Sequence, residues 1–113
     1  MHELSITQSM LNLVLEQAEK AGAKGVGRIN LVIGEMTGVV GDCVQFYFDF
    51  ISRGTIAEGA ALAIKTVPTQ ARCRGCDKLF ELKEFDWTCP YCQSNNMEIV
   101  AGKELFVESI EVE

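Results

Sequence analysis

The fold of this chain depends on residues 73–92, which read CRGCDKLFELKEFDWTCPYC. The stretch contains two pairs of cysteines, Cys73 with Cys76 and Cys89 with Cys92, with two residues inside each pair and twelve residues between the pairs. A turn of this length can direct both sulfurs of a pair at one ion, and Zn²⁺ in structural sites favours four thiolates in a tetrahedron. The spacing therefore predicts one zinc ion held by all four cysteines.

Four sulfur ligands leave no coordination position for water or a substrate, so we expect this zinc ion to be structural. We expect Gly75 to ease the first turn by adopting a positive φ, and Pro90 to preset φ in the second. A segment of about 30 residues has too little core to fold alone, so the metal should supply the missing stability. The side chains expected to form its small core are Phe80, Leu82, Phe85 and Trp87.

Other interpretations of the cysteines stay open on the residues alone. The last pair, Cys89-Pro90-Tyr91-Cys92, resembles a glutaredoxin exchange site, but such a site follows an early strand and opens a helix. Iron in a rubredoxin-like site would use the same four sulfurs. Cys43 stands apart from the pairs, and we expect it to be a small buried apolar residue, because the chain has no second histidine to activate it.

Apolar periodicity predicts a helix and a strand near the N-terminus. A helical apolar stripe covers residues 4–21, with Ser5 and Gln8 at the spacing of a capping box and Gly22 as the stop. The stripe consists of Met10, Leu11, Val14, Leu15 and Ala18. Alternation of apolar residues then predicts a strand over residues 28–33.

A second helix and two further strands surround the cysteine segment. Asp42 is expected to cap the helix and Gly54 to end it, and its many apolar residues indicate deep burial. Strands are expected over residues 62–67 and 104–112. The apolar pattern of the last strand changes phase, which indicates either a β-bulge near Ser109 or burial of both faces.

The order of these elements predicts an α+β (mixed α/β) fold. We expect a small three-stranded sheet with two helices on one face, plus an inserted zinc-ribbon-like module. The cysteine segment separates two strands of one sheet, so it is an insertion. We therefore expect residues 1–67 and 101–113 to form one α/β domain and residues 68–100 to form the inserted zinc-binding domain.

The composition argues against several classes of protein. The net charge of −6 repels phosphate backbones, which argues against nucleic-acid binding as the main role. No stretch approaches the roughly 20 apolar residues that a membrane span needs, and no secretory signal is visible. We expect a cytoplasmic protein, where thiols stay reduced and the five cysteines favour metal binding over disulfides.

The only histidine of the chain is His2. The Met1 amine, the His2 amide nitrogen and the imidazole can form fused chelate rings around one ion, with Glu3 or a partner in a fourth position. Ni²⁺ and Cu²⁺ favour nitrogen ligands in a plane. The competing interpretation, from the residues alone, is an ordinary mobile terminus that binds nothing.

The chain resembles the HypA/HybF family of hydrogenase maturation proteins, the nickel metallochaperones, over essentially its full length. The resemblance rests on MHELS at 1–5, IGE at 33–35, GT at 54–55 with EGA at 58–60, the two cysteine pairs, and IEV at 110–112.

The resemblance implies a protein that is not an enzyme. It implies that His2 is the essential nickel ligand, helped by Glu3 and the Met1 amine, and that the ion is passed to the large subunit of [NiFe]-hydrogenase. The implied partner is a HypB-type GTPase, and some members also serve urease maturation. Neither nucleic acid nor membrane is an implied partner. Some members have a second histidine near nickel, which this chain lacks.

Overall fold

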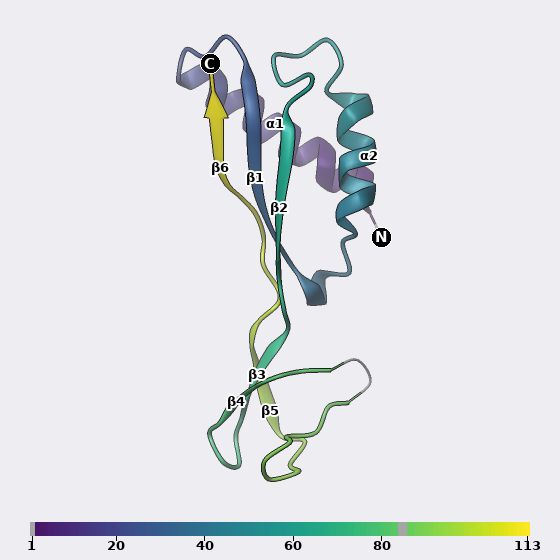
Figure 1. Ribbon diagram of the computed structural model, residues 1–113, viewed down its shortest axis with the longest axis vertical. Coiled ribbons are helices and arrows are strands. Elements are labelled where there is room, and N and C mark those ends of the chain that lie inside the picture. The colour runs from purple at the N-terminus through teal and green to yellow at the C-terminus, as the bar shows by residue number, and fades with distance from the viewer. Residues whose placement is uncertain (1, 84–85) are drawn as a thin grey trace.

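The computed structural model of the chain describes residues 2–83 and 86–113. The molecule is elongated, with extents of 55, 25 and 17 Å, and a large and a small lobe follow each other along the long axis (Figure 1). The elements are α1 Glu3–Lys20, β1 Val26–Gly34, the 3₁₀ turn η1 Glu35–Thr37, α2 Gly41–Ile51, β2 Ala61–Val67, β3 Gln70–Cys73, β4 Leu79–Glu81, β5 Met97–Ala101 and β6 Leu105–Val112. No helix in these described ranges is long and apolar enough to cross a membrane.

The large lobe contains a sheet in the order β2-β1-β6, with β1 in the centre. Strand β1 runs parallel to β2, from Arg28 opposite Ala61 to Gly34 opposite Val67, and antiparallel to β6. Parallel neighbours need a crossover connection, and α2 lies in the connection between β1 and β2. The three-stranded sheet with two helices and a cysteine module confirms the predicted α+β class.

The phase change in the last strand arises from a break in its pairing with β1. Asn30 lies opposite Ser109, but the next residue, Leu31, lies opposite Val107, so one residue of β6 is skipped. An extra residue on one strand is the definition of a β-bulge. The bulge predicted near Ser109 is confirmed, and it explains why the apolar side chains before and after it alternate out of step.

Helix α1 covers the sheet with the apolar stripe predicted from the sequence. Met10, Leu11, Val14 and Ala18 are all buried in the core of the large lobe. The predicted capping box is wrong, because the helix begins at Glu3 with His2 as its N-cap. The Ser5 hydroxyl instead donates to the carbonyl of His2, within the first turn, at 3.1 Å. Gly22, with φ +66°, follows the helix end as predicted.

Helix α2 differs most from expectation. It begins at Gly41 with Val40 as its N-cap, so Asp42 lies inside the first turn instead of capping it, and the helix ends at Ile51, before Gly54. Deep burial was also predicted wrongly. Its buried residues are Val44 and Phe48, whereas the side chains of Phe46 and Phe50 are 70% and 65% exposed. The physical reason is that α2 packs against the rest of the lobe through one side only, and nothing in the described ranges covers its outer side.

The small lobe is a second three-stranded sheet, in the order β4-β3-β5. Its core contains Ala71, Phe80, Leu82 and two of the cysteines. The predicted core positions of Phe80 and Leu82 are confirmed. Trp87 was assigned wrongly, because it is 52% exposed, and Phe85 lies outside the described residues. A core this small agrees with the expectation that a metal ion must add stability.

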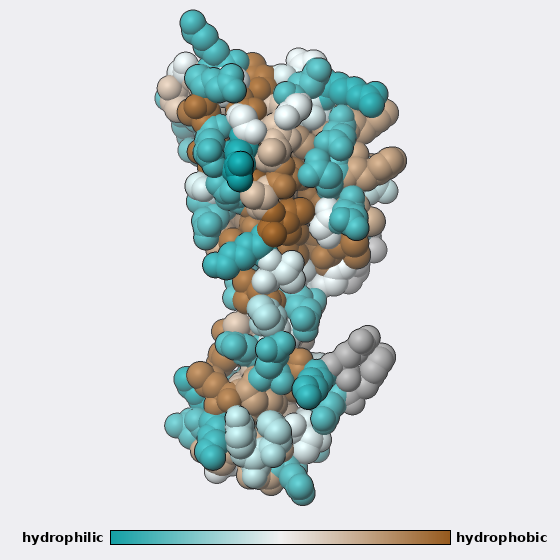
Figure 2. Space-filling model, viewed as in Figure 1, coloured by the Kyte–Doolittle hydropathy of each residue, from teal (hydrophilic) through white to brown (hydrophobic). Residues whose placement is uncertain are grey.

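The two lobes meet at a narrow waist, visible in outline in Figure 2. Here the end of β1 touches the link between β5 and β6. The Gly34 N–H donates to the carbonyl of Glu104 at 2.6 Å, and the Met36 N–H donates to the carbonyl of Gly102 at 2.8 Å. A Cβ atom on Gly34 would overlap the backbone carbonyl of Gly102, and one on Gly102 would come within 2.8 Å of the Cα atom of Thr69. The waist is therefore built from backbone packed directly on backbone.

We expect Gly34→Ala to lower the free energy of unfolding by about 3 kcal/mol or more, because the added methyl group meets backbone that cannot rotate away. Gly27→Ala is the matched control in the same strand, since its Cβ would meet its nearest neighbour, Glu113, at 3.5 Å, an ordinary contact. The control should change stability by less than about 1 kcal/mol. Urea denaturation of the metal-loaded chain measures both, and equal losses in the two variants would contradict the backbone contact.

Candidate metal sites

The four cysteine sulfurs of the small lobe come together as the sequence predicts. All four Sγ atoms lie within 4.8 Å of one another, with Cys73 and Cys92 separated by 3.4 Å and Cys76 and Cys89 by 3.7 Å. A tetrahedral ion with metal–sulfur bonds of about 2.3 Å would hold its sulfurs about 3.8 Å apart. The donor set and its spacing therefore fit one zinc-sized ion.

Each cysteine pair forms a turn in which a backbone N–H points at the first sulfur. The N–H of Gly75 donates to Cys73 Sγ at 3.3 Å, and the N–H of Tyr91 donates to Cys89 Sγ at 3.4 Å. Donors aimed at sulfur favour the charged thiolate, the form that binds metal. Accordingly, the pKa of Cys73 falls to about 6, first because the backbone N–H of Cys76 donates to its sulfur, with further hydrogen bonds from Cys92 and Gly75.

The two turns share a backbone conformation that the sequence did not reveal. The residue after each pair, Asp77 or Gln93, has a left-handed φ of 62° or 63°, and its N–H donates to the carbonyl of the first cysteine at 2.8 Å. The prediction that Gly75 supplies the positive φ was wrong, because Gly75 is not among the residues with positive φ. Neither Asp nor Gln is a strong signal for such a conformation, although Asp tolerates it better than most residues.

Charges around the cysteines are balanced. The Nε atom of Arg72 lies 3.8 Å from Oδ1 of Asp77, and its Nη1 atom lies 3.7 Å from Oε1 of Glu98. The ammonium of Lys78 lies over the ring of Tyr91, 4.7 Å from its centroid. These residues therefore form no uniformly basic strip of the kind that binds a nucleic-acid backbone, which agrees with the acidic net charge of the chain.

The second candidate site lies at the start of α1 in the large lobe. His2 is exposed and is the N-cap of the helix, and its carbonyl accepts the N–H of Ile6 at 3.0 Å. The side chain of Glu3 is only 7% exposed, and its Oε2 atom accepts the N–H of Val40, the N-cap of α2, at 3.3 Å. This hydrogen bond lowers the pKa of Glu3. Met1, the remaining predicted ligand, lies outside the described residues.

The carboxylate of Glu3 joins the first turns of the two helices. Val40 could not be recognised from the sequence as the partner of Glu3, because the two residues are 37 positions apart and the donor is a backbone group. Within residues 2–83 and 86–113, the four cysteines are the one group of three or more His, Cys, Asp or Glu ligands close enough to hold an ion. The side chains of His2 and Glu3 thus belong to no second cluster of that kind in these ranges.

Cys43 was predicted to be buried, and this is wrong, since it is exposed in the first turn of α2. It belongs to the outer side of that helix, which the rest of the described chain does not cover. Nothing in the residue type of Cys43 predicts this exposure, because a free cysteine is more often buried than exposed.

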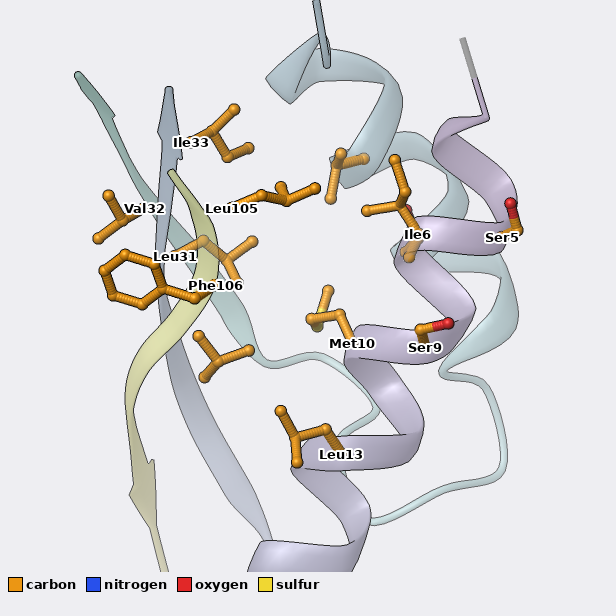
Figure 3. A pocket seen from close by; sticks show the side chains of 13 residues that line it. Ser5, Ile6, Ser9, Met10, Leu13, Leu31, Val32, Ile33, Leu105 and Phe106 are labelled. Carbon is orange, nitrogen blue, oxygen red and sulfur yellow. The ribbon is translucent and has the colours of Figure 1, made fainter. Parts of the chain in front are cut away.

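A cavity of about 370 Å³ lies between α1 and the strands β1 and β6 (Figure 3). Leu31, Ile33 and Leu105 point from the sheet toward Ile6 and Met10 of the helix. The lining includes serine and threonine hydroxyls but no ionisable side chain, so it offers no charged ligand to a cation.

Comparison with known proteins identifies a family along the whole chain. The model of the HypA family, described as hydrogenase/urease nickel incorporation, metallochaperone, matches residues 1–112. A hydrogenase maturation factor HypA of Dehalococcoides mccartyi (strain 195) is 49% identical over 113 residues, which cover 100% of this chain and 95% of that protein. Another, from Caldanaerobacter subterraneus subsp. tengcongensis, is 45% identical over 114 residues, which cover 100% of both proteins.

Solved structures are similar to the whole molecule. One solution structure of a HypA protein aligns with a TM-score of 0.73 at 27% identity, covering 99% of this chain and 96% of that one. The solution structure of the nickel metallochaperone HypA from Helicobacter pylori aligns with a TM-score of 0.66, also at 27% identity, covering 99% and 97%.

We expect Cys89→Ser to abolish stoichiometric metal binding in the small lobe, because it removes one of the four metal ligands. The core of this lobe is too small to keep the remaining three ligands in place without the ion. Backbone amides of β3 and β5 should lose protection from hydrogen exchange in the same variant. Cys43→Ser is the control and should keep both the metal and the protection. Metal analysis by mass spectrometry after dialysis, together with hydrogen exchange, measures the effect; stoichiometric metal in Cys89→Ser would contradict the assignment.

Proposed function

Because this chain belongs to the HypA family of nickel metallochaperones for hydrogenase and urease, we propose that it binds Ni²⁺ at its N-terminus and delivers the ion to the large subunit of a [NiFe]-hydrogenase. The family confirms the resemblance drawn from the sequence. It also confirms that the protein is not an enzyme, since the family is described as a metallochaperone. Nickel is thus cargo rather than a resident cofactor.

The observation that carries the proposal is the position of His2 as the exposed N-cap of α1. The first N–H groups of a helix have no hydrogen-bond partner within the helix, so the N–H of His2 can lose its proton to a metal without breaking a helical hydrogen bond. The amide nitrogen and the imidazole of His2 are then available to chelate one ion together with the Met1 amine, in the plane of nitrogens that Ni²⁺ favours. Glu3 completes the set through its amide, since its carboxylate is buried against the N–H of Val40.

The hydrogen bond between Glu3 and Val40 gives this terminal site a fixed base. The carboxylate holds the first turn of α1 against α2, so the nickel ligands extend from a buried anchor and remain at the surface. A surface site with few protein ligands releases its ion more readily than a buried cage, which suits transfer to a client. The nickel domain in this proposal comprises residues 1–67 and 101–113.

We further propose that Cys73, Cys76, Cys89 and Cys92 hold a structural zinc ion in a second domain, residues 68–100. The support is the spacing of the four sulfurs, which fits a tetrahedron, and the N–H groups that point at the sulfurs of Cys73 and Cys89. When bound, zinc would supply a crosslink between the two turns. A closed sulfur site also keeps the structural metal chemically distinct from nickel held by nitrogen.

The proposed partners are a HypB-type GTPase and the hydrogenase large subunit, with urease maturation proteins as further candidates, and the proposed compartment is the cytoplasm. A role in hydrogenase maturation follows from the family and from the names of the relatives. The acidic net charge and the balanced charges of the small lobe favour protein partners over nucleic acid.

We expect His2→Ala to abolish nickel binding while leaving the fold and the zinc content unchanged, because the imidazole lies at the surface and makes no core contact. Ser5→Ala is the control, since it changes the same helical turn but removes no proposed ligand. Calorimetric nickel titration measures binding, and circular dichroism with metal analysis measures the rest. If His2→Ala binds nickel with the affinity of the wild type, the proposal is wrong, and a zinc-bearing adaptor protein without a role in nickel delivery becomes the better interpretation.

Extra residues before Met1 should also weaken nickel binding. They convert the terminal amine, which loses its proton near pH 8, into a peptide amide, whose nitrogen is a much poorer metal ligand. The test compares one preparation before and after proteolytic removal of an N-terminal tag. Equal affinities in the two forms would remove the Met1 amine from the proposed ligand set and leave the test of His2 unaffected.

A further inference from the structure

The outer side of α2 presents two phenylalanines to solvent. Phe46 and Phe50 are one helical turn apart and are 70% and 65% exposed. They lie opposite Val44 and Phe48, which are buried in the lobe. Figure 2 shows apolar side chains projecting from the edge of the large lobe that α2 occupies in Figure 1. Exposed aromatic side chains on neighbouring turns of one helix are typical of a contact with another protein, where aromatic residues are enriched.

Contacts within and just after the helix hold both rings in place. The ring of Phe46 packs edge-on against Tyr47, with centroids 5.5 Å apart and an interplanar angle of 73°. The guanidinium of Arg53 lies over the ring of Phe50, 5.3 Å from its centroid. A surface whose side chains are already ordered loses less conformational entropy when it docks.

Two carboxylates run alongside the rings. Asp42 and Asp49 are both exposed, and with 100° of rotation per residue they lie within about 20° of one another, two turns apart. The phenylalanines lie about 70° further around the helix, so an acidic line and an aromatic line adjoin each other. The four residues Asp42, Phe46, Asp49 and Phe50 are defined here as the α2 face.

The acidic line has no cation of its own among the described residues. Arg53 is four positions after Asp49, a spacing at which an ion pair can form, but its guanidinium lies over the ring of Phe50 instead. The carboxylate of Asp49 accepts the side-chain N–H of Gln45 at 2.8 Å, which fixes its direction without neutralising its charge. Within residues 2–83 and 86–113, no basic side chain forms an ion pair with Asp42 or Asp49.

We propose that the α2 face binds a basic amphipathic helix of a different protein. Asp42, Phe46 and Phe50 follow one another at four-residue spacing, and a ridge of this kind packs into the groove between two ridges of another helix. An apolar stripe on the partner helix covers the rings, and Lys or Arg on one flank of that stripe pairs with the carboxylates. The carboxylates are about 10 Å apart along the axis, so the matching basic residues are about seven positions apart in the partner.

The chemistry of the face argues against other occupants. A second copy of the face would bring further carboxylates, and the nearest cation, Arg53, is already stacked on Phe50. An anionic lipid surface would be repelled by the same carboxylates. An extended strand would find no free backbone edge, because the N–H and C=O groups along a helix bond to one another. A basic helix is the occupant that satisfies both the rings and the carboxylates.

The α2 face begins beside the proposed nickel ligands. Val40, two residues before Asp42, donates its N–H to the carboxylate of Glu3 at the start of α1. Helix α2 has 11 residues and is about 16 Å long, so the contact is smaller than the roughly 800 Å² per partner of a standard interface and is transient. Its use during nickel transfer rests on the proposed function, whereas the contact itself needs no metal.

Two synthetic helical peptides test the chemistry of the occupant. Both have one leucine stripe, which lysines flank in one peptide and glutamates in the other. By fluorescence anisotropy, we expect the full, metal-loaded chain to bind the lysine peptide about tenfold more tightly than the glutamate peptide, and Phe46→Ser to weaken that binding about tenfold. Leu79→Ser is the control, because Leu79 is 52% exposed on β4, in the other lobe. No binding of the lysine peptide, equal affinities for the two peptides, or binding that Phe46→Ser leaves intact would overturn the proposal.

Reversal of one charge tests the pairing with the acidic line. Asp49→Lys should invert the preference, so that the glutamate peptide binds more tightly than the lysine peptide. Glu19→Lys, an equal change of net charge at an exposed position of α1, should keep the preference of the wild type. Circular dichroism checks that α2 remains helical, and if it does not, the Phe46→Ser comparison decides. A folded Asp49→Lys variant that still prefers the lysine peptide would refute the pairing.

The two proposed partner proteins, the HypB-type GTPase and the hydrogenase large subunit, extend the test to a natural helix. We expect Phe46→Ser to weaken the binding of one of them about tenfold, with Leu79→Ser again as the control. If neither affinity changes, the face binds no helix of these partners and the proposal fails. Nickel titration of the same variants reads the proposed function separately, because Phe46 is not a proposed nickel ligand and its loss should leave nickel affinity unchanged.

Discussion

The backbone of Gly34 lies so close to the carbonyl of Gly102 that no side chain fits between them. This contact fixes the end of β1 against the link between the two sheets, and the N–H of Met36 secures it. From there the chain continues through η1 to Val40, the N-cap of α2, which holds the carboxylate of Glu3. The waist, the start of α2 and the start of α1 are thus joined by one short stretch of chain, residues 34–40, whose backbone N–H groups bond the waist at one end and Glu3 at the other.

Features set by residues close together in the chain were predictable from the sequence. The spacing within each cysteine pair is a local geometric constraint, so the cluster of four sulfurs was expected and found. The phase change of the last strand indicated either a local bulge or burial of both faces, and a bulge lies between Val107 and Ser109. The apolar stripe of α1 was predicted residue by residue, because a helix with one buried face leaves a clear period of 3.6.

Features set by what lies on top of an element were not predictable in this way. The composition of α2 indicates an apolar helix, but whether Phe46 is covered depends on how many layers the rest of the chain can supply. The bond from Val40 to Glu3 joins distant positions through a backbone donor, which carries no residue-type signal. The left-handed conformations of Asp77 and Gln93 come from the closure of the cysteine turns rather than from their own preferences.

The insertion of the small lobe between β2 and β6 has a thermodynamic consequence. These strands flank β1 in one sheet, yet residues 68–104 separate them along the chain. As a disordered loop, a connection of that length would cost about 2 kcal/mol more to close than a short turn. A lobe ordered by a bound metal ion would bring its two ends together in advance and remove that entropic cost. A metal ion bound by the four cysteines would therefore stabilise the sheet of the large lobe through chain entropy, without touching any of its side chains.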